Sequence, residues 1–191
     1  MTTPRLLKAK LRTEINGLTE SELDSFSELW TIKKNLNRHE LLYQKGKTEN
    51  NIYFIESGTL KICYDLKDQE IIVGFGYKNT FIFDLPSFFT EQPSNFHIQA
   101  IKSSQLFGIN KTDFYKVLDS NLTIAKYWRT RTELILLDLV EREIDILTTS
   151  PEERYQRLQK RHPELFQHIP NKYIAAYLRM TPETLSRLKK S

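Results

Sequence analysis

Polar and apolar positions follow a helical rhythm near the start of the chain. Thr19 and Glu22 have the spacing of a capping box, in which each side chain satisfies a backbone N–H of the other residue. Apolar side chains then recur every three or four residues, at Leu23, Phe26 and Trp30. Gly17 separates this segment from the stretch 6–15, so two N-terminal helices are expected.

The pattern changes between about Ile32 and Ile109. Short runs rich in β-branched and aromatic residues alternate there with turn residues, for example at 41–43, 52–55, 60–64 and 71–73. A turn is expected at 56–59, between the second and third of these runs. Short strands with turns at roughly ten-residue intervals indicate an antiparallel β-sandwich or a jelly-roll barrel.

The segment from about Asn121 to Thr148 contains no glycine or proline and is expected to form one long helix. Its apolar side chains lie on more than one face, so more than one partner must cover it. The barrel can cover one face, and the same helix of a second subunit can cover another. The side chains predicted for this dimer interface are Leu134, Leu137, Val140 and Ile144. The alternative is a central helix of a monomeric core, which exposed charges such as Arg129 and Glu141 disfavour.

A further helix is expected to begin at Ser150-Pro151, an N-cap followed by proline in the first turn. It should end near His162-Pro163, because the residue before a proline avoids the helical conformation. A short extended segment is expected at 165–169.

Two short helices follow. Residues 171–178 form the first, a turn lies at Arg179-Met180, and Thr181-Pro182 opens the second with an N-cap hydroxyl. Two short helices joined by a tight turn indicate a helix-turn-helix.

Basic residues are concentrated in this part of the chain. The whole sequence has 28 Lys and Arg against 24 Asp and Glu, a formal net charge of +4. Residues 151–191 contain nine basic and four acidic residues. A small basic unit suggests a polyanionic partner, most simply nucleic acid; a solubilising charged tail is the alternative.

The last helix carries residue types that suit base recognition. Leu185 and Leu188 are expected to face inward, while Glu183 and Arg187 lie on the opposite side. In the major groove, arginine donates to guanine and glutamate accepts from the cytosine amino group. Contacts to DNA are therefore predicted for Lys172, Thr181, Glu183, Thr184, Ser186, Arg187, Lys189 and Lys190, with the lysines on phosphates. The alternative is a surface ion pair on a packed helical hairpin.

Other functional classes find little support. The single cysteine, Cys63, excludes an intrachain disulfide and a multi-cysteine zinc or iron–sulfur site. The four histidines include no His-x-His pair, and no nucleophile–base set or glycine-rich phosphate loop is present, so no enzyme, metal or cofactor is predicted. No apolar run is long enough for a membrane helix and no signal peptide is recognisable, so a cytoplasmic protein without membrane contact is expected.

At residues 169–190 the sequence resembles the DNA-binding helices of the Crp/Fnr transcription regulators. The recognition helix of that family commonly reads Ser/Thr-Arg-Glu-Thr-Val-x-Arg. Four positions match this pattern, Thr181, Glu183, Thr184 and Arg187, and Pro182 replaces an arginine. Residues 46–61 resemble the cyclic-nucleotide-binding-type barrel of the same family, and the order of barrel, long helix and helix-turn-helix also agrees. The opening of the segment at 150–155 is similar to the short Bacteroidetes-type branch.

The sequence also departs from the family pattern. Members that bind cyclic AMP use a Gly-Glu pair followed by Pro-Arg-Ser/Ala, but this chain has Phe83, Asp84 and Ser94 at the matching positions. Without the arginine, a buried phosphodiester would have no bidentate partner. The resemblance therefore implies an unidentified small effector other than cyclic AMP. Its pocket would be formed by Phe75, Phe83, Asp84, Leu85, Ser94, Asn95 and Phe96, and the alternative for the aromatic residues is ordinary core.

Two further departures concern the C-terminal helices. Arg179 stands at the turn position that the family usually fills with glycine, which costs about 1 kcal/mol if the residue is left-handed. The C-terminal wing hairpin of many relatives is expected to be absent.

Together these features predict an α+β fold in three parts. These are an N-terminal antiparallel jelly-roll sensory barrel (1–120), a long connecting and dimerisation helix (121–149) and a wingless helix-turn-helix unit (150–191). The predicted function is a homodimeric transcription regulator that binds an inverted-repeat operator in double-stranded DNA, with RNA polymerase as a further candidate partner. The alternative is a ligand-sensing or protein-binding barrel whose helical tail does not bind DNA.

Overall fold

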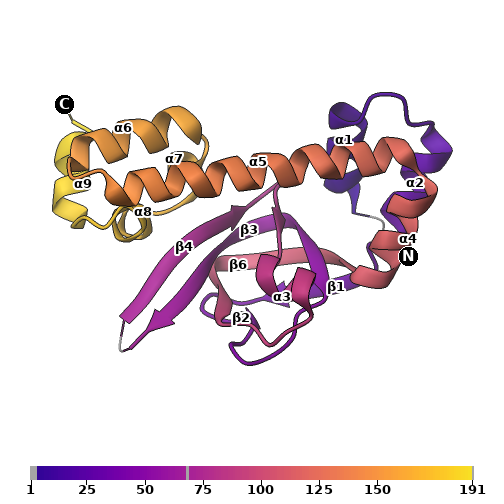
Figure 1. The fold of residues 1–191 in the computed structure, drawn as a ribbon, viewed down its shortest axis with the longest axis horizontal. Coiled ribbons are helices and arrows are strands. Elements are labelled where there is room, and N and C mark those ends of the chain that lie inside the picture. The colour runs from indigo at the N-terminus through magenta and orange to yellow at the C-terminus, as the bar shows by residue number, and fades with distance from the viewer. Residues whose placement is uncertain (1–3, 68, 191) are drawn as a thin grey trace.

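The computed structural model describes residues 4–67 and 69–190. A long helix, α5 (Leu122–Leu147), runs across the molecule, with an antiparallel sheet along one side of it (Figure 1). One group of helices surrounds its first turns and another group packs along its last turns. No helix in the described part of the chain has the length and apolar content needed to cross a membrane.

The two N-terminal helices are confirmed as α1 (Arg5–Glu14) and α2 (Glu20–Glu28). The capping box of α2 is formed as predicted. The Glu22 N–H donates to Thr19 Oγ1 at 3.3 Å, and the Thr19 N–H donates to Glu22 Oε2 at 2.8 Å. These bonds fix the point at which α2 starts.

Six strands form one antiparallel sheet in the order β1-β6-β3-β4, with β2 paired to β6 and β5 paired to β3. Their bounds are β1 (Ile32–Leu36), β2 (Leu41–Tyr43), β3 (Asn51–Leu66), β4 (Gln69–Tyr77), β5 (Phe81–Ile82) and β6 (Phe96–Asn110). A short helix, α3 (Leu85–Thr90), lies between β5 and β6. The predicted α+β class with an antiparallel sheet is thus confirmed.

The turn predicted at 56–59 is wrong, because residues 51–66 form one continuous strand. The pairing of β3 with β6 shifts its register around Ser57, and Gly58 has a φ of 96°. A Cβ on Gly58 would lie 2.5 Å from the Ser103 carbonyl oxygen, so only glycine fits here. The sequence signal is real, but it marks a β-bulge instead of a chain reversal.

This bulge exchanges the two faces of β3. Before it, Tyr53 and Ile55 belong to the inner core between the strands; after it, Leu60 belongs to that core. The opposite face presents Phe54 to the N-terminal helices and, beyond the bulge, Cys63 to the C-terminal helices. Side chains alternate with a period of two along a strand, so one extra residue moves odd positions from the inside to the outside.

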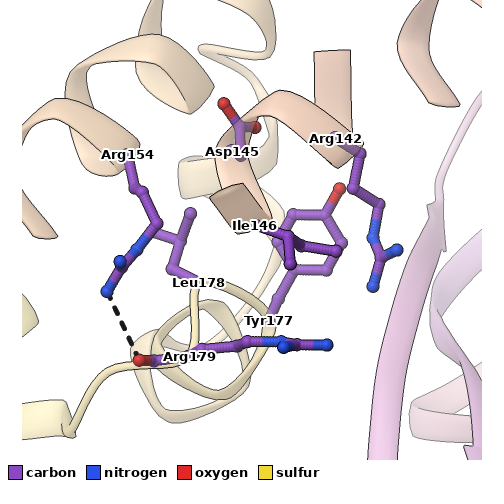
Figure 2. Close-up of a pocket in the computed structure, with 7 residues that line it drawn as sticks. All are labelled: Arg142, Asp145, Ile146, Arg154, Tyr177, Leu178 and Arg179. Carbon is purple, nitrogen blue, oxygen red and sulfur yellow. Dashed lines mark hydrogen bonds between the residues drawn. The ribbon is translucent and has the colours of Figure 1, made fainter. Parts of the chain in front are cut away.

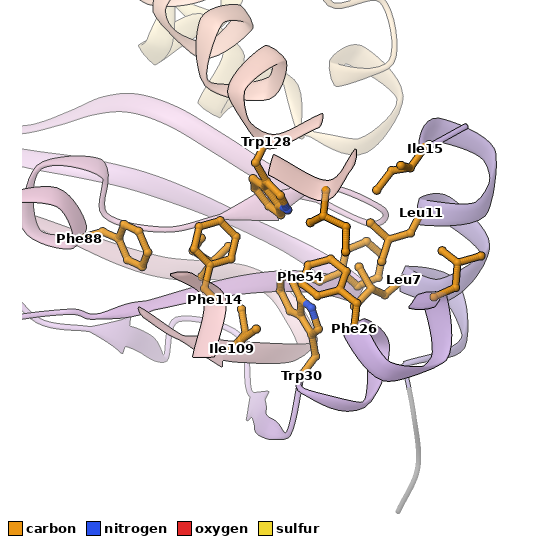
Figure 3. Close-up of a cluster of buried hydrophobic side chains, with 13 residues drawn as sticks. Leu7, Leu11, Ile15, Phe26, Trp30, Phe54, Phe88, Ile109, Phe114 and Trp128 are labelled. Carbon is orange, nitrogen blue, oxygen red and sulfur yellow. The ribbon is translucent and has the colours of Figure 1, made fainter. Parts of the chain in front are cut away.

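The N-terminal helices, α4 (Lys111–Ser120) and the start of α5 enclose a second core against the sheet (Figure 3). Its rings include Phe114 and Trp128, whose centroids are 4.9 Å apart at an interplanar angle of 86°. Edge-to-face pairs of this kind stabilise the core beyond the contribution from the burial of their apolar area. This core fixes the first turns of α5 to the sheet.

The C-terminal group contains α6 (Pro151–Arg161), α7 (Leu165–His168), α8 (Asn171–Tyr177) and α9 (Pro182–Leu188). Ser150 is the N-cap of α6, as predicted. The extended conformation expected at 165–169 is wrong, since a turn of helix occupies 165–168. The helical spacing lets Leu165 and Ile169, four residues apart, both enter the core of this group.

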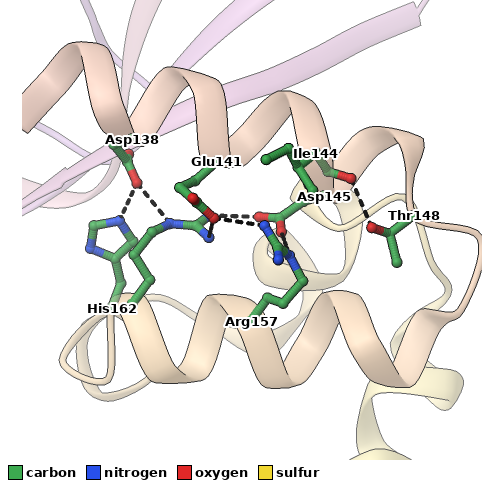
Figure 4. Close-up of polar contacts among 8 residues, drawn as sticks. Asp138, Glu141, Ile144, Asp145, Thr148, Arg157 and His162 are labelled. Carbon is green, nitrogen blue, oxygen red and sulfur yellow. Dashed lines mark hydrogen bonds and ion pairs between the residues drawn. The ribbon is translucent and has the colours of Figure 1, made fainter.

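Acidic side chains of α5 bind basic side chains of α6 (Figure 4). Asp145 is only 3% exposed, and its carboxylate accepts hydrogen bonds from Arg157 Nε at 2.7 Å and from Arg161 Nη2 at 2.6 Å. The Glu141 carboxylate accepts a hydrogen bond from Arg157 Nη2 at 2.6 Å, and its side chain is 44% exposed. These contacts, together with those of Asp138, form the α5–α6 ion-pair network.

Asp138 completes the network with Arg161 Nε at 2.8 Å and His162 Nε2 at 2.6 Å. Burial alone would raise the pKa of Asp138, but the His162 and Arg161 contacts outweigh it and lower that pKa. A carboxyl with a lowered pKa stabilises the fold above its unfolded-state value of about 4 and loses this contribution as the pH falls through the folded-state value. The network is therefore intact at neutral pH and weakens in acid.

We expect Asp145→Ala to lower the free energy of unfolding by about 3 kcal/mol, because it leaves two partly buried guanidinium groups without their shared partner. Urea denaturation followed by circular dichroism measures this change.

Glu143→Ala is the matched control, since Glu143 is an exposed acidic residue of the same helix. It should change stability by no more than about 0.5 kcal/mol. Equal effects of the two substitutions would contradict the assigned role of the network.

Candidate nucleic-acid interface and effector region

Helices α8 and α9 pack through the apolar residues predicted to face inward. Leu185 of α9 is fully buried, Leu188 is half-buried, and both contact the core that contains Ile174 of α8. Thr181 is the N-cap of α9, and its Oγ1 accepts the Thr184 N–H at 3.2 Å. The packed leucines and the cap leave the opposite side of α9 to solvent.

The turn between these helices contains a left-handed residue. Arg179 has a φ of 54°, so the conformation anticipated from the sequence is present. Its carbonyl oxygen accepts a hydrogen bond from Arg154 Nη2 at 3.4 Å, and the next N–H, of Met180, donates to Ala175 O at 3.0 Å. These contacts hold a conformation that costs a non-glycine residue about 1 kcal/mol.

A cavity of about 20 Å³ lies between this turn and α5. Its lining is formed by Arg142, Asp145, Ile146, Arg154, Tyr177, Leu178 and Arg179 (Figure 2). This volume holds about one water molecule, so the cavity is too small for an organic effector.

The outer face of α9 is a shallow hollow lined by Pro182, Glu183, Ser186, Arg187 and Lys190. Four of these are residues predicted to contact DNA, and all five are exposed. The pKa of Glu183 is lowered by a backbone N–H at the start of the helix and by Thr181. Glu183 is therefore an ionised hydrogen-bond acceptor beside basic residues.

The remaining residues of the predicted interface lie around this face. Thr181 is exposed and Thr184 is half-buried. Lys172 lies on α8, with its Nζ 4.7 Å from the centre of the Tyr173 ring. Lys189 donates from Nζ to Asn171 Oδ1 at 3.0 Å, so it lies beside the start of α8. The structure thus brings the predicted residues together on α8 and α9.

The predicted dimer residues are exposed along α5. Leu134, Leu137, Val140 and Ile144 expose 52%, 62%, 55% and 40% of their surface. Leu147, 73% exposed, extends this row and was not predicted. The spacing of three, four and three residues from Leu137 to Leu147 places these side chains on one stripe, a signal that the sequence already contained.

The C-terminal helices also contact the sheet, which the sequence did not suggest. Phe75 of β4 lies 5.4 Å from Tyr177 of α8, ring centre to ring centre. Tyr77 stacks on His168 at 4.8 Å. The predicted pocket residue Phe75 is therefore part of this contact. Phe75 and Tyr77 are two residues apart on β4, so both rings lie on the same side of the sheet, where α7 and α8 cover them.

Asp84 and Ser94 are both buried and lie together, as their assignment to one pocket requires. The Asp84 carboxylate accepts the Ser87 N–H at 2.9 Å and the Tyr43 hydroxyl at 2.8 Å, and Ser94 Oγ also donates to it. Burial, followed by the charge of Asp84, raises the pKa of Tyr43, which keeps this donor protonated. The carboxylate thus accepts three hydrogen bonds from the protein's own donors.

Tyr43 was missed in the sequence because it comes from β2, 41 residues before Asp84. The other predicted pocket residues lie around Asp84 and Ser94. Leu85 opens α3 and is half-buried, Asn95 is exposed, and the Phe96 N–H donates to Ser94 Oγ at 2.8 Å.

Phe83 belongs to the aromatic core. Its ring lies 5.5 Å from that of Phe88, centre to centre. The ordinary-core alternative therefore describes Phe83, whereas Asp84 and Ser94 form a polar group of their own.

Residues 33–121 match the family model described as the cyclic nucleotide-binding domain. A search of curated proteins by sequence gives no match.

Several solved structures resemble the whole chain. The catabolite activator protein of Thermus thermophilus is 18% identical, with a TM-score of 0.57 over 92% of this chain and 84% of that one. FixK2 from Bradyrhizobium japonicum is 15% identical, with a TM-score of 0.67 over 83% and 82% of the two chains. CooA from Carboxydothermus hydrogenoformans is 13% identical, with a TM-score of 0.69 over 100% and 87%. Residues 33–121 thus match a cyclic nucleotide-binding domain, and the chain as a whole shares its fold with these three proteins.

Proposed function

We propose that this protein is a homodimeric transcription regulator in which α8 and α9 form a DNA-binding helix-turn-helix. The observation that carries the proposal is the outer face of α9, where Glu183, Ser186, Arg187 and Lys190 line one exposed surface. Leu185 holds the other side of the helix in the core. A recognition helix needs this division, because its polar side must enter the major groove while its apolar side packs on the domain.

The residue types on this face suit DNA more closely than a general polyanion. Arg187 can donate twice to guanine, and the ionised Glu183 can accept from cytosine. Lys172, Lys189 and Lys190 surround them and suit phosphates. The likeness of residues 169–190 to Crp/Fnr recognition helices and the fold shared with the catabolite activator protein support the same function.

Dimerisation would occur through the stripe on α5. Exposed apolar side chains that form a continuous row on a helix are typical of an association surface. A second copy related by a two-fold axis would place like against like, as in other symmetric dimers. The proposed organisation is therefore a sensory unit (1–120), a dimerisation helix (121–149) and a DNA-binding unit (150–191), with RNA polymerase as a further candidate partner.

The effector of the sensory unit would not be cyclic AMP. At the position that resembles a nucleotide site, the buried Asp84 carboxylate already occupies the N-cap of α3. A nucleotide phosphate bound there would face this negative charge, with Ser94 in place of an arginine. The second candidate function is a sensory unit whose C-terminal helices bind a protein instead of DNA.

We expect the protein to be a dimer with about twice the chain mass of 22.6 kDa. Leu137→Glu should produce monomers, because it places a charge in the centre of the apolar stripe. Leu137 is 62% exposed, so the substitution should leave the core of each subunit intact. Light scattering at micromolar concentration measures the mass.

Leu139→Glu is the control, since Leu139 is 47% exposed on the same helix but lies away from the stripe. It should remain dimeric. A monomeric parent protein, or equal dissociation by both variants, would contradict the proposed interface.

Calorimetry at tens of micromolar cyclic AMP should show no binding. A ligand with a Kd of about 1 μM, which corresponds to a binding free energy of about −8 kcal/mol, would be detected under these conditions. Thermal unfolding gives a second readout that does not depend on the heat of binding. A ligand at 100 times its Kd would add about 2.7 kcal/mol of stability. Saturable low-micromolar binding would show that Asp84 and Ser94 do not exclude the nucleotide.

For DNA, we expect different effects from two basic residues, Arg187 of α9 and Lys190 just after it. Arg187→Ala should cost about 1–3 kcal/mol of binding and relax preference at one base pair in each half-site. Lys190→Ala should weaken all sequences alike and lower the salt slope by about one. Operator sequences selected from random DNA, followed by titration of single-base variants, measure both quantities.

The selected sites should be inverted repeats with centres about one helical turn apart. Uniform loss of affinity in Arg187→Ala would reject the assigned recognition face. Failure to select any sequence, together with salt-insensitive capture of a protein, would favour the second candidate function.

A further inference from the structure

Three potential metal ligands meet on the outer face of the sheet. Cys63 of β3 and His97 of β6 are direct register partners, and Glu70 comes from β4 beside them. Their ligand atoms, one from each side chain, all lie within 4.8 Å of one another. They are spread over 35 residues of sequence, from 63 to 97, and only the strand register brings them together.

The separations suit a single small cation. His97 Nε2 lies 3.2 Å from Glu70 Oε2. Ligand atoms around tetrahedral Zn²⁺ are about 3.3–3.8 Å apart, as bond lengths of about 2.0–2.3 Å require. Thiolate, imidazole and carboxylate form a donor set that borderline divalent metals accept. Small side-chain movements would therefore bring all three groups onto one ion.

The surroundings of His97 provide independent support. Its second ring nitrogen, Nδ1, lies 3.4 Å from Asp65 Oδ2. Histidines that bind metals usually donate their other N–H to a carboxylate, which fixes the ring and its tautomer. Lys61 in turn pairs with Oε1 of Glu70 and leaves Oε2 toward the histidine.

Charge and access also fit. With Cys63 as thiolate, the negative groups are Cys63, Asp65 and Glu70, and Lys61 is the positive one, which leaves two negative charges for a divalent ion. Cys63 is buried, whereas the side chains of Glu70 and Asp65 are 39% and 40% exposed. An ion can therefore enter from the solvent side and meet the sulfur at the inner end.

We propose that Cys63, Glu70 and His97 bind one divalent transition-metal ion of the zinc class, with Asp65 orienting the histidine. Three protein ligands would leave a fourth position open on the solvent side, as in zinc sites that bind water or a small ligand. Binding would form a sulfur–metal bond and release the thiol proton to solvent. The site revises the expectation of no metal, which considered only multi-cysteine sets and paired histidines.

The site adjoins the C-terminal helices. Cys63 belongs to the same buried cluster as Ile174 of α8, and Lys61 Nζ lies 5.7 Å from the centre of the Tyr173 ring. Metal binding itself does not require that the protein bind DNA, so the two proposals can be tested separately.

The test uses the full-length protein after treatment with a chelator, titrated with Co²⁺. We expect one equivalent to bind with a sulfur-to-cobalt charge-transfer band and the strong visible bands of tetrahedral cobalt, both displaced by Zn²⁺. Cys63→Ser should abolish the charge-transfer band, and His97→Gln should weaken binding more than tenfold. Asp65→Asn should weaken it about 10–100-fold while keeping the band, because it removes the charged partner of the histidine and leaves all three ligands in place.

His39→Asn is the matched control, since it removes an exposed histidine from the turn between β1 and β2 and should bind cobalt like the parent. Circular dichroism checks that each variant is folded. Cobalt binding without a charge-transfer band, or equal affinity in the parent, His97→Gln and Asp65→Asn, would overturn the site. Asp65→Asn keeps the test decisive if a substitution at the buried Cys63 does not fold.

Discussion

The β-bulge at Gly58 is the constraint on which the arrangement of the rest depends. β3 is long enough to serve two helical groups, but only the register shift lets it present Phe54 to one and Cys63 to the other. The conformation is restricted to glycine, because a Cβ would lie 2.1 Å from Ser104 Oγ, which itself accepts the Thr59 N–H at 3.1 Å. Without the extra residue, the face that meets α8 would carry inner-core side chains and the core would receive charged ones.

The C-terminal helices are consequently attached at two places with different chemistry. The α5–α6 network joins charged side chains that range from 5% exposed at Asp145 to 44% exposed at Glu141. The contact with the sheet is apolar and aromatic. Cys63 and Ile72 share a buried cluster with α8, and the rings of Phe75 and Tyr77 lie against Tyr177 and His168. Removing one member of the charged network leaves its partners without a counter-charge. Removing one ring costs the energy of that aromatic contact alone. Both attachments therefore position the helices, and α5 also carries the proposed dimer stripe.

Local patterns predicted the elements well and the long-range contacts poorly. The capping box at Thr19, the uninterrupted segment of α5 and the apolar side of α9 are local signals, and each appears where expected. The bulge was mistaken for a turn because glycine with positive φ serves both. Tyr43 beside Asp84 and the Cys63, Glu70 and His97 group depend on strand register, which the sequence pattern alone does not specify. The residues predicted to contact DNA lie near one another because they come from one short segment, and their contact with DNA stays a prediction.

A signal from the sheet to α9 would act through the contact between the sheet and helices α7 and α8. Lys61 is one of the side chains at this contact, since it pairs with Glu70 and also lies over the ring of Tyr173 in α8. A cation bound at Glu70 Oε2 would weaken the attraction between the same carboxylate and Lys61, and so change the charge beside the ring. A cation–π contact is worth about 0.5–2 kcal/mol, so its loss changes a population ratio by at most about thirtyfold. In a dimer, the loss of two such contacts changes the population ratio by at most about a thousandfold. A change from 1% to 99% of one state requires a roughly ten-thousandfold change in that ratio. Metal binding at this site would therefore adjust the position of α9 in a protein that already populates both arrangements, while Asp84 remains engaged by its own donors.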